Sequence, residues 1–200
     1  FFLATKVHEG LDARSITESL EESLRRLQTD HVDLYQIHHP GPGMRPAEMM
    51  EALDGAVRRG KARFVGACNF PAWLFAHCNA IAGRHGWAGL ACNQVPYSLI
   101  ERGIEVELLQ QAVAEGHAVT VFRPLAVGLL AGRYQTGRPI PAGSRGDEPR
   151  FTVWWERYAE GIRRLQEFAD RHGLRPSQVA IAWARQARGV SLPIVGVSSA

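Results

Sequence analysis

The sequence predicts an α/β fold in which strands and helices alternate regularly. Apolar runs typical of buried strands begin near residues 2, 32, 62, 90, 118 and 193. Most of these starts are about 30 residues apart, which is the length of one βα unit, and regular alternation implies a parallel sheet. Polar side chains recur where the strands end, as they do in the active sites of (β/α) barrels. We therefore predict a (β/α)8 TIM barrel that is incomplete, with about six βα units present.

The first two strands each carry an ionisable side chain near the far end. The run Phe2–His8 contains Lys6, and a lysine is costly to bury unless it is paired or used. Strand alternation turns Thr5 and Val7 away from the face that carries Lys6. The second run, Val32–His38, ends in a histidine. The pattern predicts that Lys6 and His38 open at the same end of the barrel.

The helices between the strands are predicted from apolar periodicity and end signals. Ser15 and Glu18 have the spacing of a capping box, with Ser15 as N-cap. The apolar stripe of this helix consists of Ile16, Leu20, Leu24 and Leu27. Further helices are expected over 46–59, 71–85, 104–115, 154–172 and 176–188. The remaining strands are expected over 63–68, 90–95, 118–123 and 193–198.

The region 126–153 is rich in glycine, proline and arginine, and we interpret it as a long loop over the site. Trp154 and Trp155 follow it. They either line a substrate pocket or pack the next helix against its neighbours, and we favour packing.

Length and composition favour one domain over residues 1–200 with a substantial core. The net charge of +3 is spread along the chain, which gives little support for nucleic-acid binding, and no apolar run is long enough to span a membrane. Cys68, Cys78 and Cys92 are odd in number and form no CxxC pair. A reducing compartment, and hence a cytoplasmic location, is expected.

No metal site is predicted. His38 and His39 are adjacent, and on a strand they point to opposite faces, one into the barrel and one toward the helix layer. The sequence contains no HExxH motif. It also lacks GxGxxG, so any dinucleotide is not held by a Rossmann turn.

Each candidate side chain also has a plain structural interpretation. Lys6 would extend its amine to water, and His38 would be a satisfied strand-end histidine. Asn69 and Gln94 would tie loops together, and Phe122 would be part of the core. Each signal is weak alone, and the joint placement at the strand ends favours function.

Two segments resemble the catalytic strands of the aldo-keto reductase family. They are Ala4-Thr-Lys6 and Asp33-Leu-Tyr-Gln-Ile-His38, and the resemblance extends over essentially the whole chain. It implies a TIM-barrel enzyme that reduces aldehydes or ketones to alcohols with hydride from NADPH, with NADH possible. It further implies that Lys6 and His38 are catalytic.

Two further segments resemble the family's binding site for the nicotinamide carboxamide. In Val65-Gly-Ala-Cys-Asn-Phe70, the resemblance assigns Asn69 to the carboxamide, and Cys68 stands where the family has serine. In Asn93-Gln-Val-Pro-Tyr-Ser-Leu99, it assigns Gln94 to the same group.

The last two matching segments resemble the parts of the family that hold the rest of the cofactor. In Val121-Phe-Arg-Pro-Leu-Ala126, the ring of Phe122 would stack on the nicotinamide. Arg123, Pro124 and Leu125 would lie along the pyrophosphate. Ile194-Val-Gly-Val-Ser198 resembles the last barrel strand, with Gly196, Val197 and Ser198 near the adenosine.

The resemblance also marks what is missing. The family's catalytic Asp and its proton-donor Tyr lie on a strand before Lys6, and a helix after the last strand reads the adenosine phosphate. We therefore expect a fragment that lacks the first two barrel strands and the C-terminal helix. Tyr35 does not replace the proton donor, because it should face the side opposite His38. A nicotinamide-binding regulatory subunit and an inactive fragment stay open as alternatives, as do the carbonyl substrate and the oligomeric state.

Overall fold

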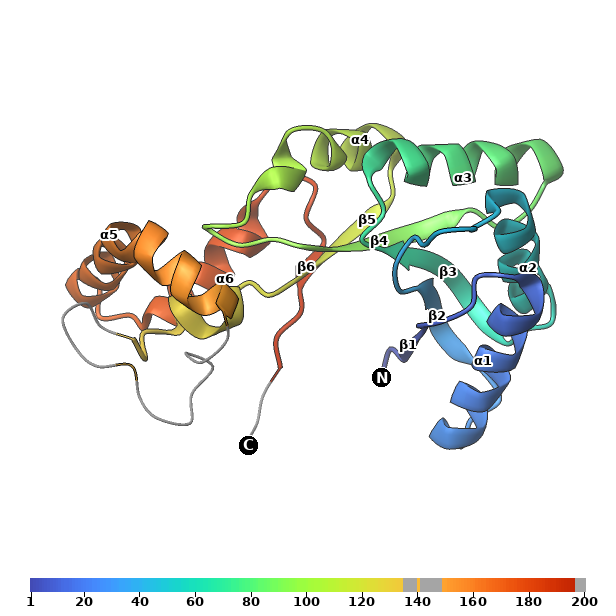
Figure 1. The fold of residues 1–200 in the computed structure, drawn as a ribbon, viewed down its shortest axis with the longest axis horizontal. Helices are drawn as coiled ribbons and strands as arrows, with labels where there is room; N and C mark the ends of the chain where they lie inside the picture. Colours follow the sequence, from blue (N-terminus) through green and yellow to red (C-terminus); the bar gives the residue numbers. More distant parts are fainter. Residues whose placement is uncertain (135–139, 141–148, 197–200) are drawn as a thin grey trace. The chain divides into compact units, whose positions relative to one another are not determined.

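A computed structural model describes residues 1–134, 140 and 149–196, and its strands and helices alternate along the chain (Figure 1). The strands are β1 (Ala4–Val7), β2 (Val32–Ile37), β3 (Ala62–Cys68), β4 (Leu90–Pro96), β5 (Ala118–Phe122) and β6 (Leu192–Pro193). Their order in the sheet follows their order in the chain, and the pairs β1–β2, β2–β3, β3–β4 and β5–β6 are parallel. The predicted α/β fold, an incomplete (β/α)8 barrel, is confirmed.

Helices connect the strands close to the predicted positions. The α-helices are α1 (Ala13–Leu27), α2 (Pro46–Arg58), α3 (Ala72–His85), α4 (Leu108–Glu115), α5 (Pro149–Arg171) and α6 (Pro176–Gln186). Two 3-10 helices are η1 (Gly103–Glu105) and η2 (Ala126–Ala131). The chain divides into two compact units, residues 1–95 with 107–119 (unit 1) and residues 96–106 with 120–200 (unit 2). Each unit is described by itself below, and the prediction of one domain stays a prediction.

The start of α1 differs from the prediction. Its N-cap is Asp12, whose carboxylate accepts hydrogen bonds from the backbone N–H and the hydroxyl of Ser15. Ser15 therefore lies inside the first turn, because a carboxylate three residues earlier already satisfies the free N–H groups. The predicted stripe is buried at Ile16, Leu20 and Leu24, whereas Leu27 is 44% exposed in the last turn.

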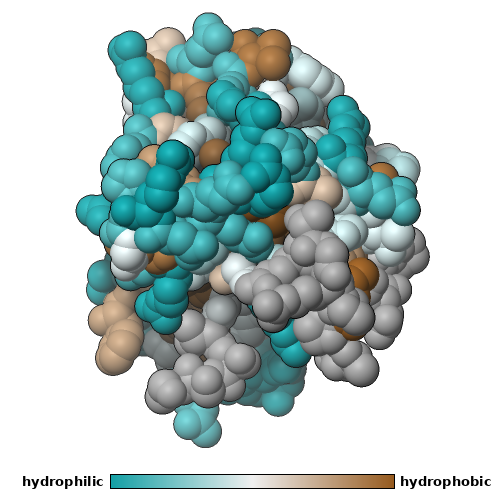
Figure 2. Space-filling view, turned by 90° about the vertical axis from the view of Figure 1, so that its left-hand side faces the viewer, coloured by the Kyte–Doolittle hydropathy of each residue, from teal (hydrophilic) through white to brown (hydrophobic). Residues whose placement is uncertain are grey.

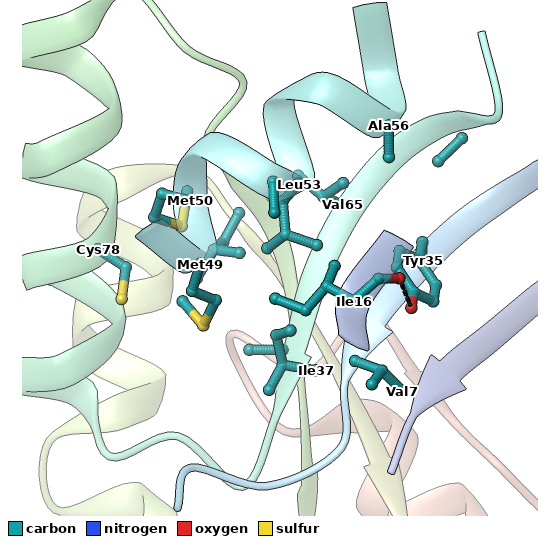
Figure 3. Packing of buried hydrophobic residues seen from close by; sticks show 14 of the residues in the cluster. Val7, Ile16, Tyr35, Ile37, Met49, Met50, Leu53, Ala56, Val65 and Cys78 are labelled. Atoms are coloured by element: carbon teal, nitrogen blue, oxygen red, sulfur yellow. Dashed lines mark hydrogen bonds between the residues drawn. The ribbon is translucent and has the colours of Figure 1, made fainter. Parts of the chain in front are cut away.

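The core of unit 1 lies between the sheet and helices α1 to α3. Val7, Tyr35, Ile37 and Val65 are fully or almost fully buried on the helix-facing side of the strands (Figure 3). The Tyr35 hydroxyl donates a hydrogen bond of 2.7 Å to the backbone oxygen of Ile16 in α1. Tyr35 thus faces the helix layer, away from the side of the sheet that carries Gln36 and Leu34.

That opposite face is defined by the strand register. Lys6 pairs with Gln36, and Gln36 pairs with Gly66. Paired residues of parallel strands project to the same side, as do residues two apart on one strand. Lys6, Gln36 and Cys68 therefore share one face. His38 is the first residue after the carboxyl end of β2.

A register shift in β4 completes this face. Val65 pairs with Leu90, but the next residue, Gly66, pairs with Cys92, so Ala91 is an extra residue in β4. A Cβ on Gly66 would lie 2.6 Å from the backbone oxygen of Cys92. Glycine is therefore required for the close approach of the two strands at this bulge.

Three predicted elements have different bounds. The expected helix over 104–115 is broken into η1 and α4, with Val106 81% exposed between them. The region 126–153 is not one loop, because η2 forms at its start and α5 begins at Pro149. Residues 135–139 and 141–148 of that region lie outside the described residues. The last strand is Leu192–Pro193 rather than 193–198.

The core of unit 2 combines aliphatic and aromatic residues. Trp154 and Trp155 pack against a buried cluster that contains Tyr134, Phe151 and Ile162, which supports packing over a pocket-lining role. Figure 2 shows the side that carries α5 and α6, and hydrophilic residues cover most of it outside the grey atoms. No helix among the described residues is long and apolar enough to cross a lipid bilayer.

Candidate functional site

Lys6 and His38 lie close together in unit 1, near the carboxyl ends of β1 and β2. Burial lowers the pKa of the His38 imidazole, and the nearby charges of His39, His8 and Lys6 lower it further. Lys6 also acts on Cys68, whose thiol pKa is raised to about 12 by burial while the ammonium of Lys6 opposes the rise. The charge of Lys6 therefore acts on both the His38 imidazole and the Cys68 thiol.

Two further histidines surround His38. The ring centroid of His38 lies 4.8 Å from that of His8 and 4.3 Å from that of His39. The prediction that His38 and His39 point to opposite faces is wrong, because β2 ends at Ile37 and strand alternation no longer applies beyond it. Among the described residues, no group of three or more His, Cys, Asp or Glu side chains is arranged to hold a metal ion.

Asn69 connects the ends of three strands. It follows β3 directly and has a φ of +60°, a left-handed conformation that asparagine tolerates better than most residues. Its backbone N–H donates to the oxygen of Gln94 at 2.9 Å, and its side-chain Nδ2 donates to the oxygen of His38 at 3.0 Å. Nδ2 also lies 3.0 Å from Nδ1 of His39. Asn69 is thus fixed at the same exit edge as His38.

Gln94 on β4 projects to the face of the sheet that carries Lys6, Gln36 and Cys68. Cys68 pairs with Gln94 across β3 and β4, so both side chains project to the side that carries Lys6. The Nε2 of Gln94 is 3.5 Å from Oε1 of the buried Gln36, which is a weak hydrogen bond. The half-buried amide of Gln94 is therefore available to a ligand.

The predicted cofactor residues at the other end of the chain line one pocket in unit 2. The pocket has a volume of about 520 Å³, and five predicted residues border it: Phe122, Arg123, Pro124, Leu125 and Gly196. Arg123 has a φ of +58° and places its guanidinium carbon 5.1 Å from the centre of the Phe122 ring. Such backbone conformations in non-glycine residues cluster at ligand sites. The predicted residues Val197 and Ser198 lie outside the described residues.

Sequence reasoning missed three residues of these two clusters. His8 and His39 flank His38, and Arg133 contributes a second arginine to the pocket of unit 2. The signal for His39 was its position after His38, but it was interpreted with strand alternation. Arg133 lay in the region taken as a loop, and no motif marks it.

The structure thus divides the predicted site residues between two clusters. Lys6, His38, Cys68, Asn69 and Gln94 lie together in unit 1, while the residues that border the pocket lie in unit 2. A sequence model described as the aldo/keto reductase family matches residues 1–200. The chain belongs to the aldo/keto reductase family. The family that the motifs around Lys6 and His38 resemble is thereby confirmed.

Several curated proteins are similar to this aldo/keto reductase chain. It is 34% identical to the uncharacterized oxidoreductase YrpG of Bacillus subtilis over 97% of this chain and 62% of that protein. It is 32% identical to the versiconal hemiacetal acetate reductase of Aspergillus parasiticus over 95% of this chain and 55% of that protein. It is 31% identical to a putative voltage-gated potassium channel subunit beta of Schizosaccharomyces pombe over 94% of this chain and 57% of that protein. The chain therefore spans less than two thirds of the length of each relative.

Proposed function

We propose that the protein containing this chain reduces aldehydes or ketones to alcohols with NADPH as hydride donor, with NADH as a possible substitute. The observation that carries the proposal is the common placement of Lys6, His38, Asn69 and Gln94. Lys6 on β1 and Gln94 on β4 project to one face of the sheet. His38 and Asn69 directly follow β2 and β3 at the exit edge of unit 1, where Asn69 is hydrogen-bonded to His38. That is where (β/α) barrels carry their chemistry.

The donor and acceptor set fits a nicotinamide dinucleotide. The amides of Asn69 and Gln94 match a carboxamide, which both donates and accepts hydrogen bonds. Arg123 and Arg133 add two cationic side chains to the pocket of unit 2, which suits phosphate oxygens. We propose Phe122 as the ring that stacks on the nicotinamide, and Gly196, Val197 and Ser198 for the adenosine end.

The cofactor, when bound, supplies the hydride from C4 of its nicotinamide. His38 is held neutral by burial and by its three basic neighbours, so it donates one ring N–H to the substrate carbonyl and positions it. The ammonium of Lys6 would stabilise negative charge that develops on the carbonyl oxygen during reduction. The proton that completes the alcohol would come from the family's tyrosine, which is expected on a strand before Lys6. A small carbonyl compound is the proposed substrate.

Lys6 gives the sharpest test, because the sequence contains a second lysine as control. We expect Lys6→Met to lower carbonyl-dependent NADPH oxidation by the complete protein at least about 10²-fold. Lys61→Met should leave the rate unchanged, since Lys61 pairs with Glu21 on the surface. Equal rates for the native protein and Lys6→Met would refute the role of Lys6.

One relative favours a second candidate function. The Schizosaccharomyces pombe protein is named as a putative potassium channel subunit, so a nicotinamide-binding regulatory role is the alternative. A protein of that kind would bind NADPH and turn over simple aldehydes hardly at all. Stoichiometric NADPH binding without measurable turnover would decide for this alternative.

A further inference from the structure

Asn69 makes three hydrogen bonds at the exit edge of unit 1, and one of them involves a side chain with no assigned role. Its backbone N–H donates to Gln94, and its side-chain Nδ2 faces both the oxygen of His38 and Nδ1 of His39. Since the side chain of His39 is exposed, its contact with Asn69 is not explained by burial. The contact therefore suggests a function for His39.

The partners fix the orientation of the Asn69 amide. The backbone oxygen of His38 can only accept a hydrogen bond, so the atom 3.0 Å from it must be the NH₂ nitrogen. The second hydrogen of this NH₂ group is then directed to His39 Nδ1, also at 3.0 Å. Within the described residues no hydrogen bond engages Oδ1 of Asn69. The carbonyl oxygen of the amide is left as an acceptor at the site.

The contact requires one tautomer of His39. Nδ1 can accept the hydrogen bond from Asn69 in the tautomer that carries its proton on Nε2. The basic groups nearby are His38, whose ring lies 4.3 Å away, and His8 and Lys6, which both act on the His38 ring. In the described part of the chain, no carboxylate forms an ion pair with His39. Protonation of His39 would replace the acceptor with a donor and break the contact with Asn69.

We propose that His39 is a positioning residue, which holds the Asn69 amide with its Oδ1 turned to accept a hydrogen bond from the N–H of the cofactor carboxamide. This inference rests on the proposed function and deepens it. His39 touches neither the cofactor nor the substrate, and acts through Asn69 alone. Removal of Nδ1 leaves the side-chain NH₂ of Asn69 held by the backbone oxygen of His38 alone, so the acceptor offered to the bound carboxamide is less firmly fixed.

The first test compares two ligands. We expect His39→Leu to weaken NADP⁺ binding by roughly five- to ten-fold, which corresponds to one hydrogen bond. The analogue in which an acetyl group replaces the carboxamide has no N–H to donate, so its affinity should change less than about two-fold. His85→Leu is the matched control, because His85 lies at the end of α3, where its exposed ring stacks on Trp87. An equal loss for both ligands would overturn the inference and leave the proposed function standing.

The second test uses pH and a conservative substitution. The side chain of asparagine carries an acceptor oxygen near the position of Nδ1 and does not titrate. His39→Asn should therefore restore NADP⁺ affinity at neutral pH and remove the part of its pH dependence that arises from His39. Identical pH profiles for the native protein and His39→Asn would overturn the proposal.

The third measurement needs no cofactor. The side-chain ¹H–¹⁵N resonances of Asn69 should shift with pH in the native protein and stay constant in His39→Asn. Constant resonances in both proteins would contradict the hydrogen bond itself. Complete absence of NADP⁺ binding by the native protein would overturn the proposed function and, with it, the positioning role, whatever the resonances show.

Discussion

The ring of His117 packs against the ring of Phe75, with centroids 4.3 Å apart, and neither of its ring nitrogens has a hydrogen-bond partner within the described residues. The side chain is 5% exposed. Burial lowers its pKa below the ordinary 6.5, and the carboxylate of Glu115, 3.8 Å away, only partly opposes this. An imidazole in such surroundings is kept neutral at the expense of stability.

The first prediction concerns stability against pH. Below about pH 6.5 the unfolded chain binds a proton at His117 while the folded chain does not, so stability falls as the pH decreases toward the lowered folded pKa. His117→Leu removes both unsatisfied nitrogens and should raise the free energy of unfolding by about 1 kcal/mol at pH 7, and by more at pH 5.5. Urea denaturation at the two pH values measures this. His77→Leu, at an exposed position of α3, should keep the native pH dependence.

The second prediction concerns the bulge between β3 and β4. Gly66→Ala forces a Cβ to within 2.6 Å of the backbone oxygen of Cys92 and should cost about 1–3 kcal/mol of stability. Gly83→Ala is the matched control, since no atom lies within 4 Å of a Cβ built there in α3. Because alanine favours helix, this variant should gain about 0.5–1 kcal/mol. Thermal unfolding of the two variants gives the comparison, and similar melting temperatures would contradict the close approach.

The third prediction concerns a polar network in unit 2. The Tyr97 hydroxyl donates to a carboxylate oxygen of Glu105 at 2.6 Å, and its ring stacks on Trp183 at 5.0 Å. Tyr97→Phe keeps the stacking and removes the hydrogen bond, so it should destabilise the protein by about 1–2 kcal/mol. Denaturant titration tests this, with Tyr158→Phe on α5 as the control. No difference between the two variants would show that the hydroxyl contributes nothing.

The fourth prediction concerns the pocket of unit 2. If Arg123 contacts a phosphate, Arg123→Gln should weaken NADPH binding by about 10-fold or more and reduce its dependence on salt. Arg157→Gln replaces an exposed arginine of α5 that does not border the pocket, and should bind like the native protein. Fluorescence titration at two ionic strengths distinguishes them. Parallel salt dependence in the native protein and Arg123→Gln would exclude a phosphate contact for Arg123.

Much of the fold was predictable because each element carries its own signals. Apolar runs about 30 residues apart located five strands closely, and Gly116 ends α4 as expected with a φ of +72°. The grouping of Lys6 with His38 followed from the rule that parallel strands present their carboxyl ends at one edge. These predictions needed only the local pattern of apolar residues and the rule that parallel strands end at one edge of a sheet.

The failures have a common physical cause, which is that element ends depend on tertiary contacts. His39 was misplaced because β2 ends at Ile37, one residue before the predicted end, and the rings of His38 and His39 then lie close together. Ser15 was taken as a cap because its own spacing to Glu18 is favourable, whereas Asp12 competes with it for the same N–H groups. No local signal distinguishes these outcomes.

The extra residue Ala91 has a consequence for the two adjacent amides of β4. With uninterrupted pairing, Asn93 would stand opposite Cys68 and Gln94 would be turned into the helix layer. The inserted residue reverses the faces to which the two side chains point, so Gln94 faces the side of Lys6. Asn93 is buried, and its Nδ2 donates a hydrogen bond to the backbone oxygen of Phe70. Deletion of one alanine would thus exchange the amide that we propose to bind the cofactor for one with a structural role.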